Sequence, residues 1–360
     1  MFDKRVSNEV KGIAIILMLI HHLFYCLYTF CLQYDVNMYP LSGETMRILS
    51  QNGKVCVSMY VFIIAYGITK GNFAKKEQLS RNSINVSAIN RCVKLWGNFT
   101  FIYLLTLCTV GLREKTLIEI YGGGWIGVFN AFIDLFGLRG LFGTPGLNET
   151  WWYMSLAFLL IFAVPLLNVV YDRYGLSIVV ILGYFSYLMS NGGTSFLHYL
   201  FSVILGILMA ESNGFDRIKT MKLFKIDALN SVIKVIFFLA TIVSLYLLRD
   251  GTDLSCFIDP LFTICVCGLC VEVHNIPYGV NRITEFLGKH SMNIFLVHTL
   301  IFEYYFTEFI YSFDNWLFIL LALLISSLLV SIVCECLKKF LRWDRMIFKI
   351  TAVINQKNSL

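Results

Sequence analysis

The stretch from Lys11 to Tyr25, KGIAIILMLIHHLFY, decides how the rest of the chain is interpreted. Apart from Lys11 and the adjacent His21 and His22, the stretch is apolar. A helix rises about 1.5 Å per residue, so His22 lies roughly 16 Å beyond Lys11, near the middle of a hydrocarbon core about 30 Å thick. An imidazole at that depth is costly to bury and usually has a function. The stretch therefore predicts a membrane-spanning helix that carries a functional histidine pair.

The composition extends this prediction to the whole chain. Of its 360 residues, 58% are hydrophobic and 14% are charged, whereas a soluble domain is closer to half apolar and a quarter charged. The mean hydropathy is +0.71 and apolar runs recur along the whole length, which excludes a soluble domain with one anchor. The sequence predicts an all-α, multi-pass protein of the cell membrane, with one transmembrane domain over residues 1–345 and a cytoplasmic C-terminal tail over residues 346–360.

The apolar runs predict about ten transmembrane helices. The fifth and sixth are short and are separated by Asn191-Gly192-Gly193, so they form either two tilted spans or one re-entrant hairpin. The predicted spans are 12–31, 52–70, 95–112, 150–168, 175–190, 195–210, 233–249, 255–273, 290–311 and 316–337.

The basic residues predict the orientation of these helices. With both termini in the cytoplasm, 23 of the 29 Lys and Arg residues fall in inner segments and 6 fall in outer segments. Such a bias toward the cytoplasmic side is the usual signal of membrane orientation. An odd number of spans would place one terminus on the wrong side of the bias.

Three histidines are candidates for chemistry. His21 and His22 project about 100° apart on a helix, so at most one of them faces a given cavity squarely. A neutral imidazole can take a proton from a hydroxyl group and return it, as a general base for acyl transfer must; the alternative is a structural hydrogen bond to a neighbouring helix. His298 ends the stretch GKHSMNIFLVH, residues 288–298, at a predicted depth similar to that of His22. Two titratable residues in one buried layer favour a functional site.

Two further motifs stand near predicted membrane surfaces. Arg91 and Lys94 lie three residues apart where the third span leaves the cytoplasm, and they share a helix face. They could hold the phosphates of a cytoplasmic ligand, or they could only orient the helix and bind headgroups. The stretch Asn148-Glu-Thr-Trp-Trp-Tyr153, with Trp152 and Tyr153 as its candidate site residues, stands at the outer start of the fourth span. Trp and Tyr are ordinary anchors there, and Trp faces can also stack on sugar rings.

The longest predicted outer segment, residues 113–149, has its own pattern. Apolar residues recur in it at helical spacing, with Asp134 and Arg139 between them, and the three glycines 122–124 precede them. This pattern predicts an amphipathic helix at the membrane surface. Its role is either a lid over an external opening or simple packing against the bilayer.

The eleven cysteines do not predict a disulfide framework, since most lie inside apolar runs. The sequence CVCGLC, residues 265–270, resembles a metal-binding spacing, but Cys265 and Cys267 point to different faces of a helix. We expect these cysteines to be buried apolar residues and expect no metal site.

Four motifs together resemble one known family. KGIAIILMLIHHLFY resembles the first helix of the acyltransferase 3 family of integral membrane acyltransferases, and the spacing from Ala14 favours His22 as the family's histidine. RCVKLW, residues 91–96, looks like the basic motif of the family's third helix. LGKHSMNIFLVH, residues 287–298, is similar to a late family motif, and TWWYMSLAFLLIFAVPLL, residues 150–167, to its central Trp-containing helix. The four matches occur in the family's order.

The resemblance implies a reaction and a set of roles. The reaction is acyl transfer, usually of acetyl, from a coenzyme A thioester in the cytoplasm to a hydroxyl group of a surface polysaccharide or lipid-linked sugar. Acyl-CoA is then a donor substrate, with no permanently bound cofactor and no nucleic acid, and polysaccharide-assembly proteins are candidate partners. The implied roles are catalysis for His22 with His21, donor binding for Arg91 and Lys94, and substrate contact or structural support for Trp152, Tyr153, Ser291 and His298.

Two other functions fit the same pattern of spans. A transporter or flippase for a glycan or lipid-linked unit would also have many spans and a buried polar layer. A non-catalytic membrane partner in a polysaccharide-assembly complex would need neither histidine of the pair.

Overall fold

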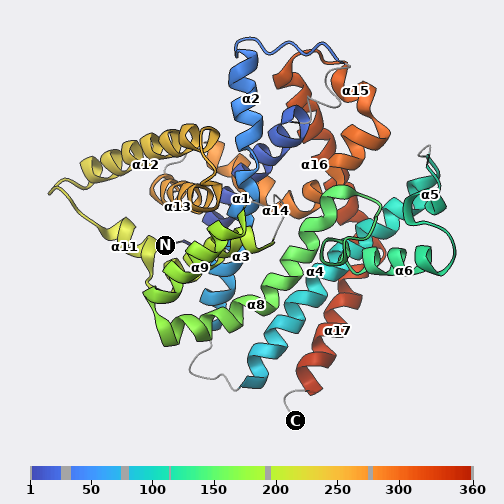
Figure 1. Ribbon diagram of the computed structural model, residues 1–360, viewed down its shortest axis with the longest axis horizontal. Coiled ribbons are helices and arrows are strands. Elements are labelled where there is room, and N and C mark those ends of the chain that lie inside the picture. Colours follow the sequence, from blue (N-terminus) through green and yellow to red (C-terminus); the bar gives the residue numbers. More distant parts are fainter. Residues whose placement is uncertain are drawn as a thin grey trace. The chain divides into compact units, whose positions relative to one another are not determined.

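The computed structural model is built of helices (Figure 1). It describes residues 2–25, 34–73, 81–112, 115–190, 196–274 and 279–357. In these ranges no strand occurs, and the one β-contact is an isolated bridge between Asn37 and Asn315. The all-α prediction is confirmed. Parts of the predictions that fall on residues 26–31, 113–114, 191–193 and 358–360 lie outside the described residues.

Seven described helices are long and apolar enough to cross a membrane, or eight if a bent pair counts as one span. The bent pair joins Phe196–Glu211 to Gly214–Thr220 at 59° and corresponds to the predicted sixth span. Two of the ten predicted spans are not in this set. The fifth, α9 (Leu176–Leu188), has only 13 residues. The ninth, residues 290–311, covers the second half of α14 (Gly279–Thr299), the π-helical turn η8 (Leu300–Tyr305) and α15 (Thr307–Tyr311). The chain is a multi-pass membrane protein.

The chain divides into two compact units, each assembled from separate stretches of sequence. The first comprises Met1–Gly71, Val164–Ser291 and Asp314–Leu320, and the second comprises Asn72–Ala163, Met292–Phe313 and Leu321–Leu360. Four described helices contribute residues to both units: α3 (Val55–Phe73), α8 (Trp152–Tyr174), α14 and α16 (Trp316–Phe340). The remaining helices of the first unit are α1 (Lys4–Ile20), η1 (His21–Tyr25), α2 (Gly43–Asn52), α9, η7 (Phe196–Tyr199), α10 (Leu200–Glu211), α11 (Gly214–Thr220), α12 (Asp227–Asp250) and α13 (Ser255–Val273). Those of the second are α4 (Arg81–Thr109), η4 (Val110–Leu112), α5 (Leu117–Tyr121), α6 (Gly124–Leu135), α7 (Arg139–Phe142), η5 (Glu149–Trp151), η8 (Leu300–Tyr305), α15 (Thr307–Tyr311) and α17 (Trp343–Lys357).

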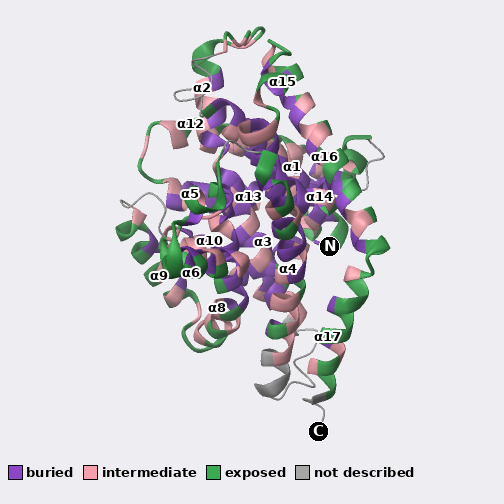
Figure 2. Ribbon diagram, turned by 90° about the vertical axis from the view of Figure 1, so that its right-hand side faces the viewer, coloured by how far each residue is buried: buried purple, intermediate pink, exposed green. Residues whose placement is uncertain are grey.

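The first unit is packed around α13. Helices α1, α10 and α12 all contact it, and α12 lies beside it in Figure 1. Buried positions are dense on α13 (Figure 2), whereas few positions of α12 are buried. Helix α10 approaches α3 closely, since a Cβ on Gly206 would lie 2.7 Å from the carbonyl oxygen of Phe62. The buried hydroxyl groups of Ser58 and Ser202 meet at 2.7 Å across this crossing. Small residues at a crossing are typical of membrane helices, where packing replaces the hydrophobic drive.

In the second unit, the C-terminal helix α17 packs along α4 (Figure 1). The indole nitrogen of Trp343 donates to the carbonyl oxygen of Gly97 at 2.9 Å, and a Cβ on Gly97 would lie 2.5 Å from the Ile347 side chain. Residues 346–357 of the predicted tail therefore belong to a helix that is packed on the rest of the unit.

Polar residues gather at two separate places in the first unit. Lys4 and Lys70, which the charge bias assigns to the cytoplasm, line one cavity of about 380 Å³ together with Asp216. Lys54 and Arg249, which it assigns to the outside, line another of about 440 Å³. The two cavities have no lining residue in common.

Candidate active site

The two histidines of the first helix lie where its geometry changes. Asp3 caps the start of α1 by accepting from the backbone of Arg5 at 2.8 Å and of Val6 at 3.0 Å. The helix then continues to Ile20 and ends in the π-helical turn η1, which carries His21 and His22. A π-turn inside a helix is rare and is frequent at functional sites. It widens the helix at the histidine pair.

The ring of His21 is held in place by three contacts. Its Nδ1 atom lies 2.8 Å from the carbonyl oxygen of Ser50. Its ring stacks on Tyr25 at 4.8 Å and meets the His22 ring edge-on at 5.1 Å. A carbonyl oxygen can only accept, so Nδ1 carries the proton and Nε2 of a neutral ring keeps the lone pair. This tautomer is the one that a general base acting through Nε2 requires.

Ser50 can reach His21 because the junction of α2 and α3 lies against the end of α1. A Cβ on Gly53 would stand 2.5 Å from the carbonyl oxygen of Leu17 and 3.0 Å from Cβ of His21. Only glycine permits this approach without displacement. Ser50 could not be predicted from the sequence, because it acts through its backbone carbonyl.

The glycines of two sequence motifs join the same pair of helices. In the first unit, a Cβ on Gly12 of α1 would overlap the carbonyl oxygen of Thr284 in α14, and a Cβ on Gly288 of α14 would overlap that of Asn8 in α1. The motifs KGIA and LGKHS therefore cross at backbone contact. Ser291 follows on α14 as a buried residue of the first unit.

His298 belongs to the second unit and is fully buried. Its Nδ1 atom donates to the carbonyl oxygen of Phe295, one helical turn earlier, at 2.8 Å. The Phe295 ring in turn meets Tyr153 edge-on at 5.5 Å. His298 and Tyr153 are therefore linked through one phenylalanine. Trp152, which precedes Tyr153 in the sequence, is half-buried.

The stretch from Asn148 to Tyr153 also contains a buried polar network. Trp151 is fully buried, and its indole nitrogen donates to the carbonyl oxygen of Leu296 at 3.0 Å. Asn148 donates to the Thr299 hydroxyl at 2.8 Å and accepts from Thr150 at 2.8 Å. This buried polar network fixes the start of α8 to α14 within the second unit. The sequence predicted only membrane anchors or sugar-stacking rings at this place, and the polar network was not predicted.

Arg91 and Lys94 lie on α4 in the second unit. Arg91 is half-buried and Lys94 is exposed. Among the described residues, neither makes an ion pair with an acidic side chain.

Residues 115–149 fold into short helices of the second unit. The predicted amphipathic helix is α6, and its outer face exposes large apolar side chains, among them Trp125 at 88% and Ile126 at 72%. Asp134 points inward and accepts at one carboxylate oxygen from the Tyr121 hydroxyl at 2.7 Å and the Leu147 backbone at 2.8 Å. Burial raises the pKa of the Asp134 carboxyl above its ordinary value. Asp134 is thus the inner anchor of this segment.

The described ranges include the side-chain types that metal sites use as ligands. No three His, Cys, Asp or Glu side chains gather there in a way that could hold an ion. The described cysteines, including Cys265, Cys267 and Cys270, are free thiols.

Comparison with known proteins identifies the family. A family model described as an acyltransferase domain, the acyltransferase 3 domain, matches residues 8–336. Neither the search of curated proteins nor that of solved structures finds a match. The match covers most of the chain and includes all four motifs, and membership implies acyltransferase activity. The chain belongs to the acyltransferase 3 family of membrane-bound acyltransferases.

Proposed function

We propose that the protein transfers an acetyl group from cytoplasmic acetyl-CoA to a hydroxyl group of a cell-surface polysaccharide or lipid-linked sugar. Membership of the family supports acyl transfer in general. The acetyl donor and the sugar acceptor come from the resemblance of the four motifs. No described feature favours the transporter or the non-catalytic partner over this reaction.

His22 is the general base in this proposal, and His21 is its positioning residue. The base takes the proton of the acceptor hydroxyl as the oxygen attacks the thioester carbon. The carbon–sulfur bond breaks, the carbon–oxygen ester bond forms, and the imidazolium returns the proton to the departing thiolate. The products are an O-acetylated acceptor and free coenzyme A.

The observation that carries the proposal is the ordered ring of His21. Its Nδ1 proton goes to Ser50 and its face is covered by Tyr25, so the ring presents a defined edge to His22. A catalytic base needs such support, because a misplaced ring loses much of its rate advantage.

Arg91 and Lys94 are the donor-binding residues in this proposal. They share a face of α4, and neither is neutralised by a described acidic side chain. A guanidinium binds phosphate oxygens in a bidentate manner, and an ammonium adds a point charge. The phosphates of coenzyme A are ligands of this kind.

The test is a measurement of O-acetyl groups on the surface glycan of a deletion strain. The strain is complemented with the wild-type gene, with His22→Ala, or with His290→Ala as a histidine control from the cytoplasmic part of α14. We expect His22→Ala to abolish acetylation at normal membrane abundance and His290→Ala to retain it. Full acetylation with His22→Ala would refute the assignment of the base, and an unacetylated wild-type glycan would refute the reaction.

A further inference from the structure

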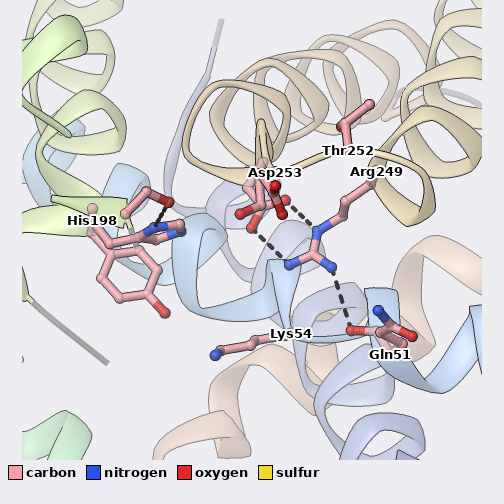
Figure 3. Close-up of a pocket in the computed structure, with 10 residues that line it drawn as sticks. Gln51, Lys54, His198, Arg249, Thr252 and Asp253 are labelled. Carbon is pink, nitrogen blue, oxygen red and sulfur yellow. Dashed lines mark hydrogen bonds and ion pairs between the residues drawn. The ribbon is translucent and has the colours of Figure 1, made fainter. Parts of the chain in front are cut away.

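A polar cavity of about 440 Å³ opens in the first unit, among residues that the charge bias assigns to the outside. Figure 3 shows the side chains of Lys54, His198 and Arg249 converging on this space from separate helices. Gln51 and Lys54 come from the α2–α3 junction, His198 comes from η7, and Arg249 comes from the end of α12. The volume lies within the range of roughly 300–1,000 Å³ that small-molecule sites occupy.

One wall of the cavity is a fixed ion pair. Arg249 donates from Nε to Asp259 at 2.6 Å and from a terminal nitrogen to the other carboxylate oxygen at 3.2 Å. Its remaining terminal nitrogen donates to the side-chain oxygen of Asn52 at 3.1 Å. The side chains of Arg249 and Asp259 are only 11% and 3% exposed. A buried pair of this kind is a costly way to stabilise a fold, but it presents rigid polar edges to a ligand.

The opposite wall is also polar and ordered. The Nδ1 atom of His198 lies 2.9 Å from the hydroxyl oxygen of Ser190, and the backbone of His198 accepts from Ser186 at 2.6 Å. The neighbouring Tyr199 is buried and adds an aromatic side chain to the lining. Histidine, serine and tyrosine offer both donors and acceptors of hydrogen bonds.

The balance of charge restricts the ligand. The lining includes two cations, Lys54 and Arg249, and two carboxylates, Asp253 and Asp259. Their formal charges cancel, with Arg249 and Asp259 already paired to each other. A polyanion would find no net positive charge here, whereas a neutral molecule with many hydroxyl groups would find matched donors and acceptors.

The cavity is connected to the histidine pair by one short segment. Ser50 accepts from His21, and the next residue, Gln51, lines the cavity. Gly53 lies against Cβ of His21, and the next residue, Lys54, lines the cavity again. The segment 50–54 therefore faces the base-bearing helix on one side and the cavity on the other.

We infer that this cavity binds the acceptor as a neutral, hydroxyl-rich sugar unit and delivers its hydroxyl to the histidine pair. The inference rests on the proposed function, since it assigns the acceptor of that reaction to a site. The α2–α3 junction then has two roles, as a wall of the acceptor site and as the support of His21.

The test blocks the cavity with a bulky side chain and measures the KM for glycan and the KM for acetyl-CoA separately. Full-length protein in lipid nanodiscs is supplied with acetyl-CoA and with surface glycan extracted from a deletion strain. Ser255→Trp and Thr252→Trp each place an indole in the lining from an independent position. Leu261→Trp, on an exposed apolar face of α13, is the matched control. We expect both cavity variants to raise the KM for glycan at least about tenfold with no change in the KM for acetyl-CoA, and the control to behave as wild type.

The outcomes separate this inference from the proposed function. Absence of glycan acetylation by the wild type would refute the proposed function. Wild-type acetylation together with an unchanged KM for glycan in both folded cavity variants would refute the cavity alone. Competition tests the ligand class, because neutral methyl hexosides should inhibit transfer more strongly than methyl glucuronide. Stronger inhibition by the glucuronide, or inhibition by neither, would show that the class is wrong.

Discussion

His21 donates its Nδ1 proton to the carbonyl oxygen of Ser50 over 2.8 Å, which ties the end of the first helix to the last turn of α2. The contact fixes the tautomer of a half-buried imidazole without using any side chain of the partner helix. The residue after Ser50, Gln51, lines the polar cavity, so the same turn of α2 contacts His21 and borders the cavity. A movement of α2 would therefore act on the histidine pair and on the cavity together.

The first prediction separates the two nitrogen atoms of His21. In His21→Asn the amide nitrogen can take the place of Nδ1 and keep the hydrogen bond to Ser50, whereas in His21→Ala the bond is lost. If His21 positions His22, the Asn variant should keep more activity than the Ala variant, by about tenfold for a lost support of roughly 1–1.5 kcal/mol. The measurement is kcat for glycan acetylation in nanodiscs. Equal loss in both variants would instead mean that Nε2 of His21 acts in the chemistry.

The second prediction concerns the crossing of α1 and α14. Gly12→Ala and Gly288→Ala each place a Cβ on a backbone carbonyl of the other helix, so the helices must move apart. We expect each to destabilise the protein by roughly 1–3 kcal/mol, as overpacking does. Gly67→Ala is the control, because it lies in α3 with no neighbour within 4 Å, and it should be neutral or slightly stabilising. Thermal unfolding in detergent measures the difference, and equal melting temperatures for all three would contradict the crossing.

The third prediction concerns the ion pair of the cavity. Asp259→Asn leaves Arg249 buried without a countercharge and should cost roughly 3–5 kcal/mol of stability. The double variant Arg249→Met with Asp259→Leu removes both charges and should recover much of that loss. Lys222→Met, which breaks an ion pair on the surface, should change nothing measurable. If the double variant is less stable than Asp259→Asn, the pair contributes more than charge compensation.

The overall class of the fold followed from composition, because apolar runs of membrane length admit only helices. The histidine pair was found for the same reason, since a polar residue inside such a run stands out. The two spans that the structure does not count were harder to judge. Helix α9 has an apolar run too short to span alone, and α14 begins with polar residues before its apolar half. The length of α9 and the polarity of the start of α14 lie close to the limits that separate a membrane span from a shorter or more polar helix.

The supports of the site could not be predicted from the sequence. Ser50 acts through its backbone, and Gly53, Gly12 and Gly288 act through the absence of a side chain. Arg249 and Asp259 come from two neighbouring helices and pair only after α12 folds back on α13. The full burial of Trp151 could not be predicted either, because Trp151 and Trp152 are adjacent residues of the same type and only the structure shows which of them is buried.

The fourth prediction tests that burial. Trp151→Phe removes the hydrogen bond to Leu296 and part of the contact with Phe99, whose ring lies 5.1 Å away edge-on. We expect a loss of roughly 1–3 kcal/mol, since a buried carbonyl loses its additional donor and a cavity opens. Trp152→Phe is the control, because Trp152 is half-buried and should tolerate the change. Chemical denaturation followed by tyrosine and tryptophan fluorescence gives both values, and a greater loss for Trp152→Phe would contradict the assigned roles.

The last prediction uses the pH dependence of the segment that carries α5 and α6. The pKa of Asp134 is raised by burial above its ordinary 3.8, so the folded state holds this proton more tightly than the unfolded state does. The contribution of Asp134 is therefore largest below pH 3.8 and decreases as the pH rises through the folded-state pKa. Glu119 of α5 has a pKa lowered from its ordinary 4.5 by hydrogen bonds from Thr116. Its contribution to stability therefore depends on pH in the opposite sense and is lost as the pH falls.

The two carboxyl groups can be compared in one set of melting curves between pH 4 and pH 7. The stability of the wild type relative to Asp134→Asn should decrease as the pH rises, because Asn carries no titrating proton. The stability of the wild type relative to Glu119→Gln should increase over the same interval, and this variant serves as the internal control for any general effect of pH on the detergent. Parallel curves for the wild type and Asp134→Asn would show that Asp134 titrates alike in the folded and unfolded states. The burial of Asp134 on the inner face of α6 would then not hold in solution.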